Sequence, residues 1–212
     1  ASAFYQTLWV KRFLPSLDGL IAVSCATRDL GVARGIPIGK FSVVPNGIEP
    51  SVDAQAFSEK DLEAFLGMPV SGKRILLTVG RLAKRKGVAW FVRNVLPALP
   101  KNTLYLVAGA GPEEDHIREA IHESGMENRV KLLGRVSDYD HLMLLRVAHL
   151  FIQPNIPVKH DIEGFGIALI EATAEGLPVV ASRLEGLQEA IADGQNGVLV
   201  EPENPASFVS AI

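Results

Sequence analysis

A short segment bounded by glycines, Gly80 to Gly87, is rich in cationic residues. Arg81 and Lys86 follow an apolar run and precede a stretch with helical periodicity. A guanidinium, an ammonium and the free N–H groups at the start of a helix together suit the charge of a diphosphate. The alternative is a solvated basic turn, because Lys84 and Arg85 stand beside them.

Two glutamates, Glu163 and Glu171, flank a glycine-rich segment. Glycine lets the backbone approach a ligand closely, and helical periodicity begins at about Ile167. Glu163 is therefore expected on a loop, and Glu171 on the following helix with its side chain directed toward the helix N-terminus. Such carboxylates can accept hydrogen bonds from the vicinal hydroxyls of a ribose or hexose. Two unrelated surface acids are the alternative.

A single scaffold must position these residues if they are to act together. Short apolar or β-branched runs alternate with helical segments, which predicts α/β structure: a doubly wound parallel sheet with crossover helices. The expected strands are Leu20–Val23, Phe41–Val44, Ile75–Val79, Leu104–Ala108, Val130–Leu133, Leu150–Gln153, Pro178–Ala181 and Val198–Val200. The expected helices include Glu59–Leu66, Glu113–Ser124, Ile167–Glu175 and one that begins at Ser137-Asp138 and runs toward Val147.

Ligands of open parallel sheets bind beyond the carboxyl ends of the strands. Gly80 and Arg81 follow one expected strand, Gly109 and Gly111 follow the next, and Glu163 lies in the loop after a third. We therefore expect these residues to converge on one edge of the sheet.

Other motifs are incomplete. Gly109-x-Gly111 lacks the third glycine of a dinucleotide-binding fingerprint, since Glu114 stands in its place. Residues 35–40 resemble a P-loop only superficially, because the spacing differs and Phe41 replaces the metal-binding hydroxyl. The sequence contains no G-x-S-x-G nucleophile elbow and no C-x-x-C or H-E-x-x-H metal motif.

Composition excludes further classes. Of 212 residues, 48% are hydrophobic and 21% charged, as in folded globular proteins. The net charge of −3 argues against nucleic acid as a partner, and Cys25 alone cannot form an internal disulfide. Apolar stretches fall short of the ~18 residues needed to span a membrane, and the start lacks both Met and a signal-peptide layout. We interpret the chain as part of a longer intracellular protein, expected in the cytoplasm.

The segment from Glu163 to Ser182 reads EGFGIALIEATAEGLPVVAS and resembles the E-x7-E signature of retaining GT-B glycosyltransferases of family 4. The resemblance covers nearly the whole chain. It extends through 79–87, 107–112, 194–197 and 199–200, and upstream through 20–24 and 43–48, which resemble that family's interdomain stretch. The resemblance implies the C-terminal, Rossmann-like half of a GT-B fold, with three layers.

The resemblance also implies roles for particular residues. Arg81 and Lys86 match the residues that bind the donor diphosphate and stabilise the leaving nucleotide. Glu163 matches the glutamate beside the transferred sugar, so these three are the expected catalytic residues. Glu171 matches the ribose-binding glutamate.

The remaining donor-binding residues follow from the same match. The implied set is completed by Gly80, Gly109 and Gly111, by Val136 beside the base, and by the backbone of Phe165, Gly166 and Ile167 around phosphate and sugar hydroxyls. The sequence departs from the family pattern at Glu185-Gly186-Leu187, where a double glycine is common. Neither a metal nor another cofactor is expected, because cations supply the charge.

These matches predict a domain organisation. Residues 1–48 are expected to end an N-terminal domain and its interdomain stretch, 49–73 to form a linker with an entry helix, and 74–212 to bind the donor, with the closing helix truncated. The expected function is transfer of a hexose from a nucleotide-diphosphate sugar. A non-catalytic nucleotide-sugar-binding module and a GT-B-type epimerase or phosphorylase remain alternatives.

The expected partners include an acceptor sugar, lipid or small molecule, held mainly by the N-terminal domain. Peripheral contact with the inner face of the membrane is also expected of the full-length protein. We expect this chain alone to bind a nucleotide diphosphate without transferring sugar. It is further expected to self-associate through the apolar residues before Leu20, which are Phe4, Tyr5, Leu8, Trp9, Phe13 and Leu14.

Overall fold

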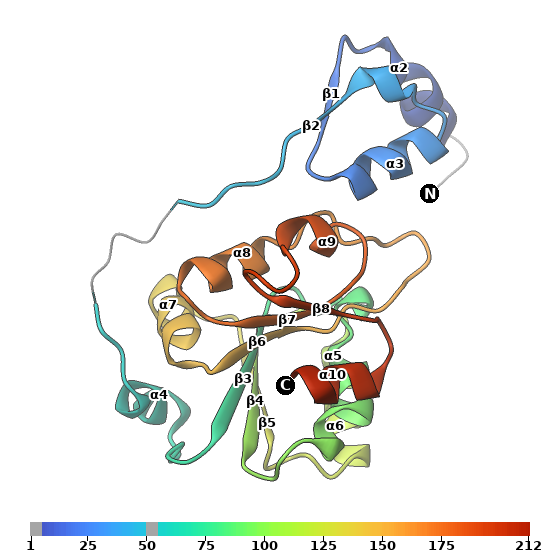
Figure 1. Ribbon diagram of the computed structural model, residues 1–212. Coiled ribbons are helices and arrows are strands. Elements are labelled where there is room, and N and C mark those ends of the chain that lie inside the picture. Colours follow the sequence, from blue (N-terminus) through green and yellow to red (C-terminus); the bar gives the residue numbers. More distant parts are fainter. Residues whose placement is uncertain (1–5, 50–54) are drawn as a thin grey trace.

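The computed structural model describes residues 6–49 and 55–212 and has two parts (Figure 1). In the N-terminal unit, β1 (Leu20–Ala22) and β2 (Phe41–Val43) pair in parallel. Between them lie α3 (Cys25–Ala33) and a 3₁₀ turn, η2 (Ile38–Lys40). A helix with π-type hydrogen bonding, η1 (Gln6–Phe13), runs into the short α2 (Leu14–Ser16) ahead of β1.

The larger part is a six-stranded, entirely parallel sheet in the order β5-β4-β3-β6-β7-β8. Its strands are β3 (Arg74–Val79), β4 (Thr103–Ala108), β5 (Val130–Gly134), β6 (Leu150–Gln153), β7 (Val179–Ser182) and β8 (Val198–Val200). The helices are α4 (Glu59–Leu66), α5 (Val88–Asn94), α6 (Glu114–Glu123), α7 (Asp138–Val147), α8 (Ile167–Ala174), α9 (Leu187–Ala190) and α10 (Pro205–Ala211), with 3₁₀ turns η3 (Lys84–Lys86) and η4 (Leu96–Ala98).

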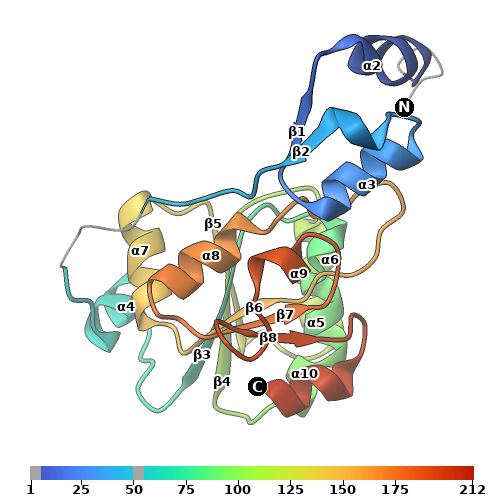
Figure 2. The same cartoon turned by 45° about the horizontal axis from the view of Figure 1, so that its top comes forward.

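Helices cover both faces of this sheet, as a doubly wound fold requires (Figure 2). One buried cluster joins α4, α7, α8 and α9 to one face, where Leu77 and Phe151 are fully buried. The other joins α5, α6 and α10 to the opposite face, around Phe91 and Tyr105. Because both faces are covered, the strands are mostly apolar, although Thr78, Gln153 and other polar residues are buried in them. The predicted three-layer α/β fold is confirmed.

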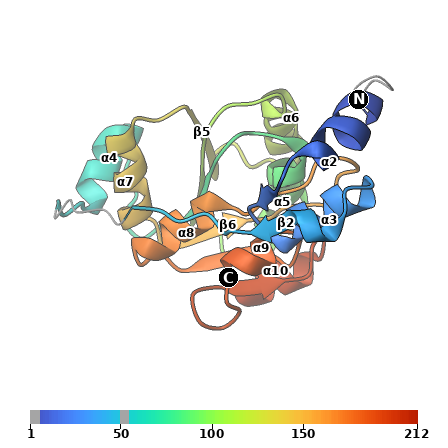
Figure 3. The same ribbon diagram turned by 90° about the horizontal axis from the view of Figure 1, so that it is seen from above.

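The strands begin and end within one residue of their expected bounds. The hydroxyl of Ser137 accepts a hydrogen bond from the N–H of Asp140 and caps α7, as its position predicts. The expected linker with its entry helix is more than a connection. Leu62 of α4 is fully buried, and α4 lies beside α7 (Figure 3), so this helix belongs to the core of the six-stranded part.

Hydrogen bonds from the start of α3 join the N-terminal unit to the larger part. Both oxygens of Glu189 on α9 accept backbone hydrogen bonds from the start of α3, one from Cys25 at 2.9 Å and one from Ala26 at 3.3 Å. The hydroxyl of Thr27 donates to the carbonyl of Gly164 at 3.5 Å. The loop that contains Glu163 is thereby joined to α3.

The apolar residues of the N-terminal unit are only partly covered. Trp9 and Phe13 are both 45% exposed and pack edge to face, while Val10 between them is buried. Phe4 and Tyr5 lie outside the described residues, and self-association through this region stays a prediction. Within residues 6–49 and 55–212, no helix combines the length and apolar character needed to cross a membrane.

Candidate functional site

The strand order reverses direction between β3 and β6, which are hydrogen-bonded neighbours. From β3 the chain proceeds toward β4 and β5, and from β6 it proceeds the other way toward β7 and β8. Open α/β sheets bind their ligands at such a switch point, beyond the carboxyl ends of the strands. The two loops that leave it are residues 80–87 and 154–166. These loops carry both cations and the first glutamate that the sequence singles out.

A buried ion pair joins these two loops. The Nζ of Lys86 lies 2.6 Å from Oε2 of Glu163, and the residues are only 8% and 7% exposed. The guanidinium of Arg85 lies 3.7 Å from the same oxygen. The side-chain amide of Asn155 donates a hydrogen bond to it at 3.1 Å. A buried pair needs such additional hydrogen bonds to offset the loss of hydration.

The protonation equilibria of the pair follow from burial and mutual attraction. Burial lowers the pKa of the Lys86 ammonium, although the charge and hydrogen bond of Glu163 act in the opposite direction. Burial alone would raise the pKa of Glu163, but the charge and hydrogen bond of Lys86, aided by Arg85 and Asn155, outweigh it and lower that pKa. Glu163 is therefore a carboxylate at neutral pH.

The lowered pKa of Glu163 predicts a pH-dependent stability. The unfolded chain protonates this carboxyl more readily than the folded one, so its contribution is fully present above the ordinary pKa of 4.5 and is lost as the pH falls through the lowered value. We expect the free energy of unfolding to fall more steeply in acid for the wild type than for Glu163→Gln. The pKa of Asp61 is also lowered, by its hydrogen bonds with Ser58. Because Asp61 is present in both proteins, its contribution cancels when the two pH profiles are compared. Parallel curves from urea titrations at several pH values would contradict this expectation.

A chain of hydrogen bonds between buried side-chain amides ends on the carboxylate of Glu163. Gln153 at the end of β6 donates to Oδ1 of Asn155 at 2.9 Å, and Asn155 in turn donates to Glu163. The hydroxyl of Ser182 holds the backbone carbonyl of Asn155 at 2.7 Å. Gln153 and Asn155 are fully buried, and Oε1 of Gln153 has no hydrogen-bond partner in the described part of the chain. No sequence motif marks these residues, and the available signal is a polar residue at the end of an apolar strand.

A second group of expected residues lines a pocket of about 470 Å³ beside this pair. Its lining includes Gly80, Arg81, Gly109 and Gly111, together with Arg135, which is not among the donor-binding residues expected from the sequence. A Cβ at Gly109 would lie 1.9 Å from the carbonyl oxygen of Gly80, and one at Gly111 would lie 2.2 Å from that of Leu82. These glycines therefore let the loops after β3 and β4 touch.

Arg81 differs from Lys86, the other cation of its loop that is expected to bind the diphosphate. Its side chain is exposed. Within the described residues it makes no ion pair or side-chain hydrogen bond, whereas Lys86 is paired with Glu163. An exposed guanidinium at the switch point can bind an anionic ligand without first breaking an internal bond.

Glu171 lies in a different pocket, of about 490 Å³, between α7, α8 and residues 47–49. Gly166, which immediately precedes its helix α8, has a φ of +88°, a backbone conformation that favours glycine. The structure thus brings Lys86 and Glu163 into contact and places Arg81 and Glu171 in separate pockets. Ile167 is 45% exposed at the first turn of α8.

Two other expected donor-binding residues, Phe165 and Val136, pack in or against the core. Phe165 is buried in the core beneath α8, and Val136 packs against the same core. The side chain of Phe165 is therefore withdrawn from a ligand, whereas Val136 is half-buried and keeps part of its side chain accessible.

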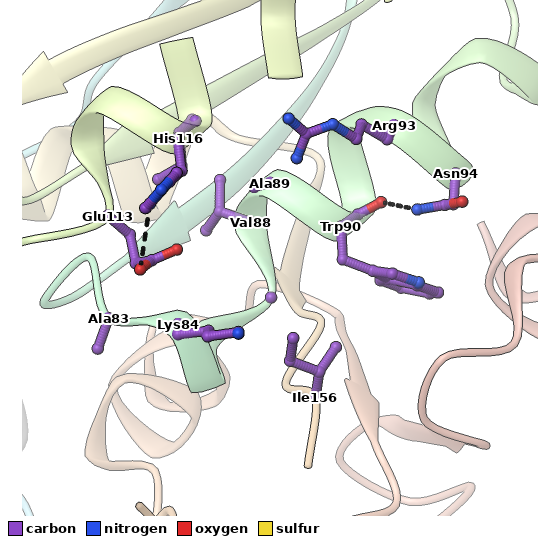
Figure 4. Close-up of a pocket in the computed structure, with 12 residues that line it drawn as sticks. Ala83, Lys84, Val88, Ala89, Trp90, Arg93, Asn94, Glu113, His116 and Ile156 are labelled. Carbon is purple, nitrogen blue, oxygen red and sulfur yellow. Dashed lines mark hydrogen bonds and ion pairs between the residues drawn. The ribbon is translucent and has the colours of Figure 1, made fainter. Parts of the chain in front are cut away.

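A further pocket, of about 330 Å³, lies between α5 and α6 (Figure 4). Apart from Lys84, its charged and polar side chains are already engaged with neighbours. His116 lies 3.4 Å from Glu113, Asn94 donates to the carbonyl of Trp90, and Arg93 is paired with Glu123. It is therefore a weaker candidate than the loops at the switch point. In residues 6–49 and 55–212, no group of three or more His, Cys, Asp or Glu side chains is arranged to hold a metal ion.

A parallel sheet in this strand order, with ligand-accessible loops at its switch point, defines a Rossmann-like nucleotide-binding type of domain. Residues 73–212 match the family described as glycosyl transferases group 1, and the chain belongs to that family. The sequence-based resemblance is confirmed at this level.

Individual relatives agree with the family. The uncharacterized glycosyltransferase MJ1607 of Methanocaldococcus jannaschii is 32% identical over 175 residues, which are 81% of this chain and 44% of that protein. The amylovoran biosynthesis glycosyltransferase AmsK of Erwinia amylovora is 33% identical over 184 residues, 85% of this chain and 43% of the relative. The chain thus spans less than half the length of these curated relatives.

Solved structures show the same fold. The crystal structure of Anabaena Alr3699/HepE in complex with UDP and glucose superposes with a TM-score of 0.82 at 25% identity, covering 99% of this chain and 56% of that one. A structure of the same Anabaena protein with UDP-glucose gives a TM-score of 0.79 at 26% identity, over 91% and 52% of the two chains.

Proposed function

We propose that this chain is the donor-binding part of a retaining, family 4 glycosyltransferase that transfers a hexose from a nucleotide-diphosphate sugar to an acceptor. The observation that carries the proposal is the buried Lys86–Glu163 pair at the switch point, together with the exposed guanidinium of Arg81, which forms no ion pair with any described residue. The Anabaena neighbours, whose structures contain UDP and UDP-glucose, support UDP as the nucleotide.

In this proposal each charged residue has one task. Arg81 and Lys86 bind the donor diphosphate, and Glu163 lies beside the sugar. Glu171 accepts hydrogen bonds from the ribose hydroxyls. The acceptor is held by a part of the protein other than this chain, so the chain binds the donor without transferring sugar.

The backbone completes the proposed site. The N–H groups of Phe165, Gly166 and Ile167 face phosphate and sugar hydroxyls, and Val136 lies beside the base. The absence of a side chain at Gly109 and Gly111 lets the loop after β4 approach the loop after β3, and Gly80 supplies the carbonyl that Gly109 approaches.

The charges explain how such a site lowers the barrier. Breaking the bond between the anomeric carbon and the diphosphate oxygen leaves negative charge on the departing diphosphate and positive charge on the sugar. Cations that are already in place stabilise the first without reorganisation, which is typically the largest electrostatic contribution to catalysis. Because Arg81 and Lys86 supply this charge, the proposal requires no metal.

Arg81→Ala tests the proposal with the least structural disturbance. We expect the affinity for UDP, measured by calorimetry, to fall about 10- to 100-fold, corresponding to the loss of a hydrogen bond between charged groups. The free energy of unfolding should change by less than about 0.5 kcal/mol, because the side chain is exposed. Excess EDTA should leave the affinity of the wild type unchanged.

The matched control for this experiment is Arg74→Ala. Arg74 is also exposed but lies at the opposite, amino end of β3, so UDP affinity should be unaffected. Equal UDP affinities of the two variants would refute the placement of Arg81. Failure of the wild type to bind any nucleoside diphosphate would refute the proposed function.

A further inference from the structure

Glu185 lies between β7 and α9 in a backbone conformation that its residue type disfavours. Its φ is +49°, in the left-handed region, where a side chain meets steric hindrance that glycine avoids. It is also the position at which the sequence departs from the resembled family pattern. Backbone strain of this kind persists where the surroundings impose it, and an observed outlier is a reason to ask what it does.

The side chain of Glu185 reaches the loop at the switch point. Its Oε2 accepts a hydrogen bond from the backbone N–H of Glu163. The N–H of Gly186 donates to the carbonyl of Glu163 at 3.2 Å, so both main-chain polar groups of that residue are held. A Cβ at Gly186 would lie 2.1 Å from the carbonyl oxygen of Gly164, which shows how closely the two loops touch.

Folding alone gives little reason for this arrangement. Burial raises the pKa of Glu185, and the charge of Glu163 raises it further, against the hydrogen bond from the Glu163 backbone. Glu185 is a half-buried carboxylate close to a second carboxylate, and its backbone conformation is disfavoured. A glycine at this position would avoid all three energetic costs. What glycine could not supply is an acceptor for the N–H of Glu163.

We propose that Glu185 is a positioning residue for Glu163. Its carboxylate fixes the Glu163 backbone, while Lys86 and Asn155 fix the side chain, so that the Glu163 carboxylate is set in one orientation toward the donor sugar. The inference rests on the proposed function in that it assigns Glu163 to the sugar. It predicts that Glu185 governs the part of the donor affinity that the sugar contributes and leaves the part that UDP contributes unchanged.

The test compares UDP with UDP-glucose by calorimetry on the wild type, Glu185→Gly and Glu185→Gln. For Glu185→Gly we expect UDP affinity within about twofold of the wild type and the ratio of UDP-glucose to UDP affinity lowered about tenfold, as for a lost charge-assisted hydrogen bond. Glu185→Gln should restore most of this ratio, because its amide oxygen can accept the same N–H. An unchanged ratio in Glu185→Gly would overturn the proposal.

A second measurement needs no ligand. Amide hydrogen exchange at Glu163 should be at least about tenfold faster in Glu185→Gly, since the hydrogen bond that protects this N–H is lost. Glycine also relieves the strained φ, so the melting temperature should not fall and a folding defect is not expected to obscure the result. If the wild type bound neither nucleotide, the proposed function would fail, and the exchange rate would still decide whether Glu185 holds Glu163.

Discussion

Replacing Lys86 by methionine is expected to lower the free energy of unfolding by about 3–5 kcal/mol, although methionine nearly fills the same volume. The variant leaves the Glu163 carboxylate buried with its nearest cation removed, and Arg85 at 3.7 Å compensates only in part. The loss of stability therefore equals the desolvation free energy of Glu163 that the interaction with Lys86 no longer offsets. Urea denaturation at pH 7 measures it.

The control for this prediction is an ion pair of the same length on the surface. Arg118 and Glu114 on α6 are also 2.6 Å apart but are exposed, and Arg118→Met should cost less than about 1 kcal/mol. The double variant Lys86→Met with Glu163→Gln should be less destabilised than the sum of the single variants, because no unpaired charge is then buried. Strictly additive effects would show that the pair is not coupled.

Replacing Gly109 by alanine is expected to destabilise the protein by about 2–5 kcal/mol. About 1–2 kcal/mol arises from placing a side chain at a φ of +134°. Another 1–3 kcal/mol, roughly, arises from overpacking, since the new Cβ would lie 1.9 Å from the carbonyl oxygen of Gly80. UDP affinity should also fall, because the loops after β3 and β4 must separate.

Gly125→Ala separates these two contributions. Gly125 follows α6 with a φ of +63°, and a Cβ there would have nothing within 4 Å. Only the backbone cost of about 1–2 kcal/mol should remain. Equal losses for the two variants in urea denaturation would show that contact between the loops has no part in the effect of Gly109→Ala.

The fold could be predicted from the sequence because each strand is a mostly apolar run that is followed by a glycine, a cationic residue or turn residues. The edge on which the loops converge then follows from the parallel topology. The core role of α4 could not be predicted in this way, since only the folded chain brings Leu62 to the face of the sheet. The spacing of apolar residues predicts that a segment is helical, but it does not show which other element the helix packs against.

The site was predictable in its residue types and less so in its contacts. Lys86 and Glu163 were expected at one edge, but their direct pairing over a long sequence separation depends on the order of β3 and β6. Gln153 and Asn155 carry no sequence motif and become meaningful only as a buried chain of hydrogen bonds. The departure at Glu185 was visible in the sequence, whereas its hydrogen bond to the Glu163 backbone was not.

The contact between α3 and Glu189 has a thermodynamic consequence for the loop beside it. Both oxygens of one carboxylate hold α3, so separating the N-terminal unit breaks both hydrogen bonds together. The same separation removes the Thr27 hydroxyl from the carbonyl of Gly164, next to Glu163. Linkage is reciprocal: a ligand that binds this loop more tightly when α3 is attached must strengthen that attachment by the same factor.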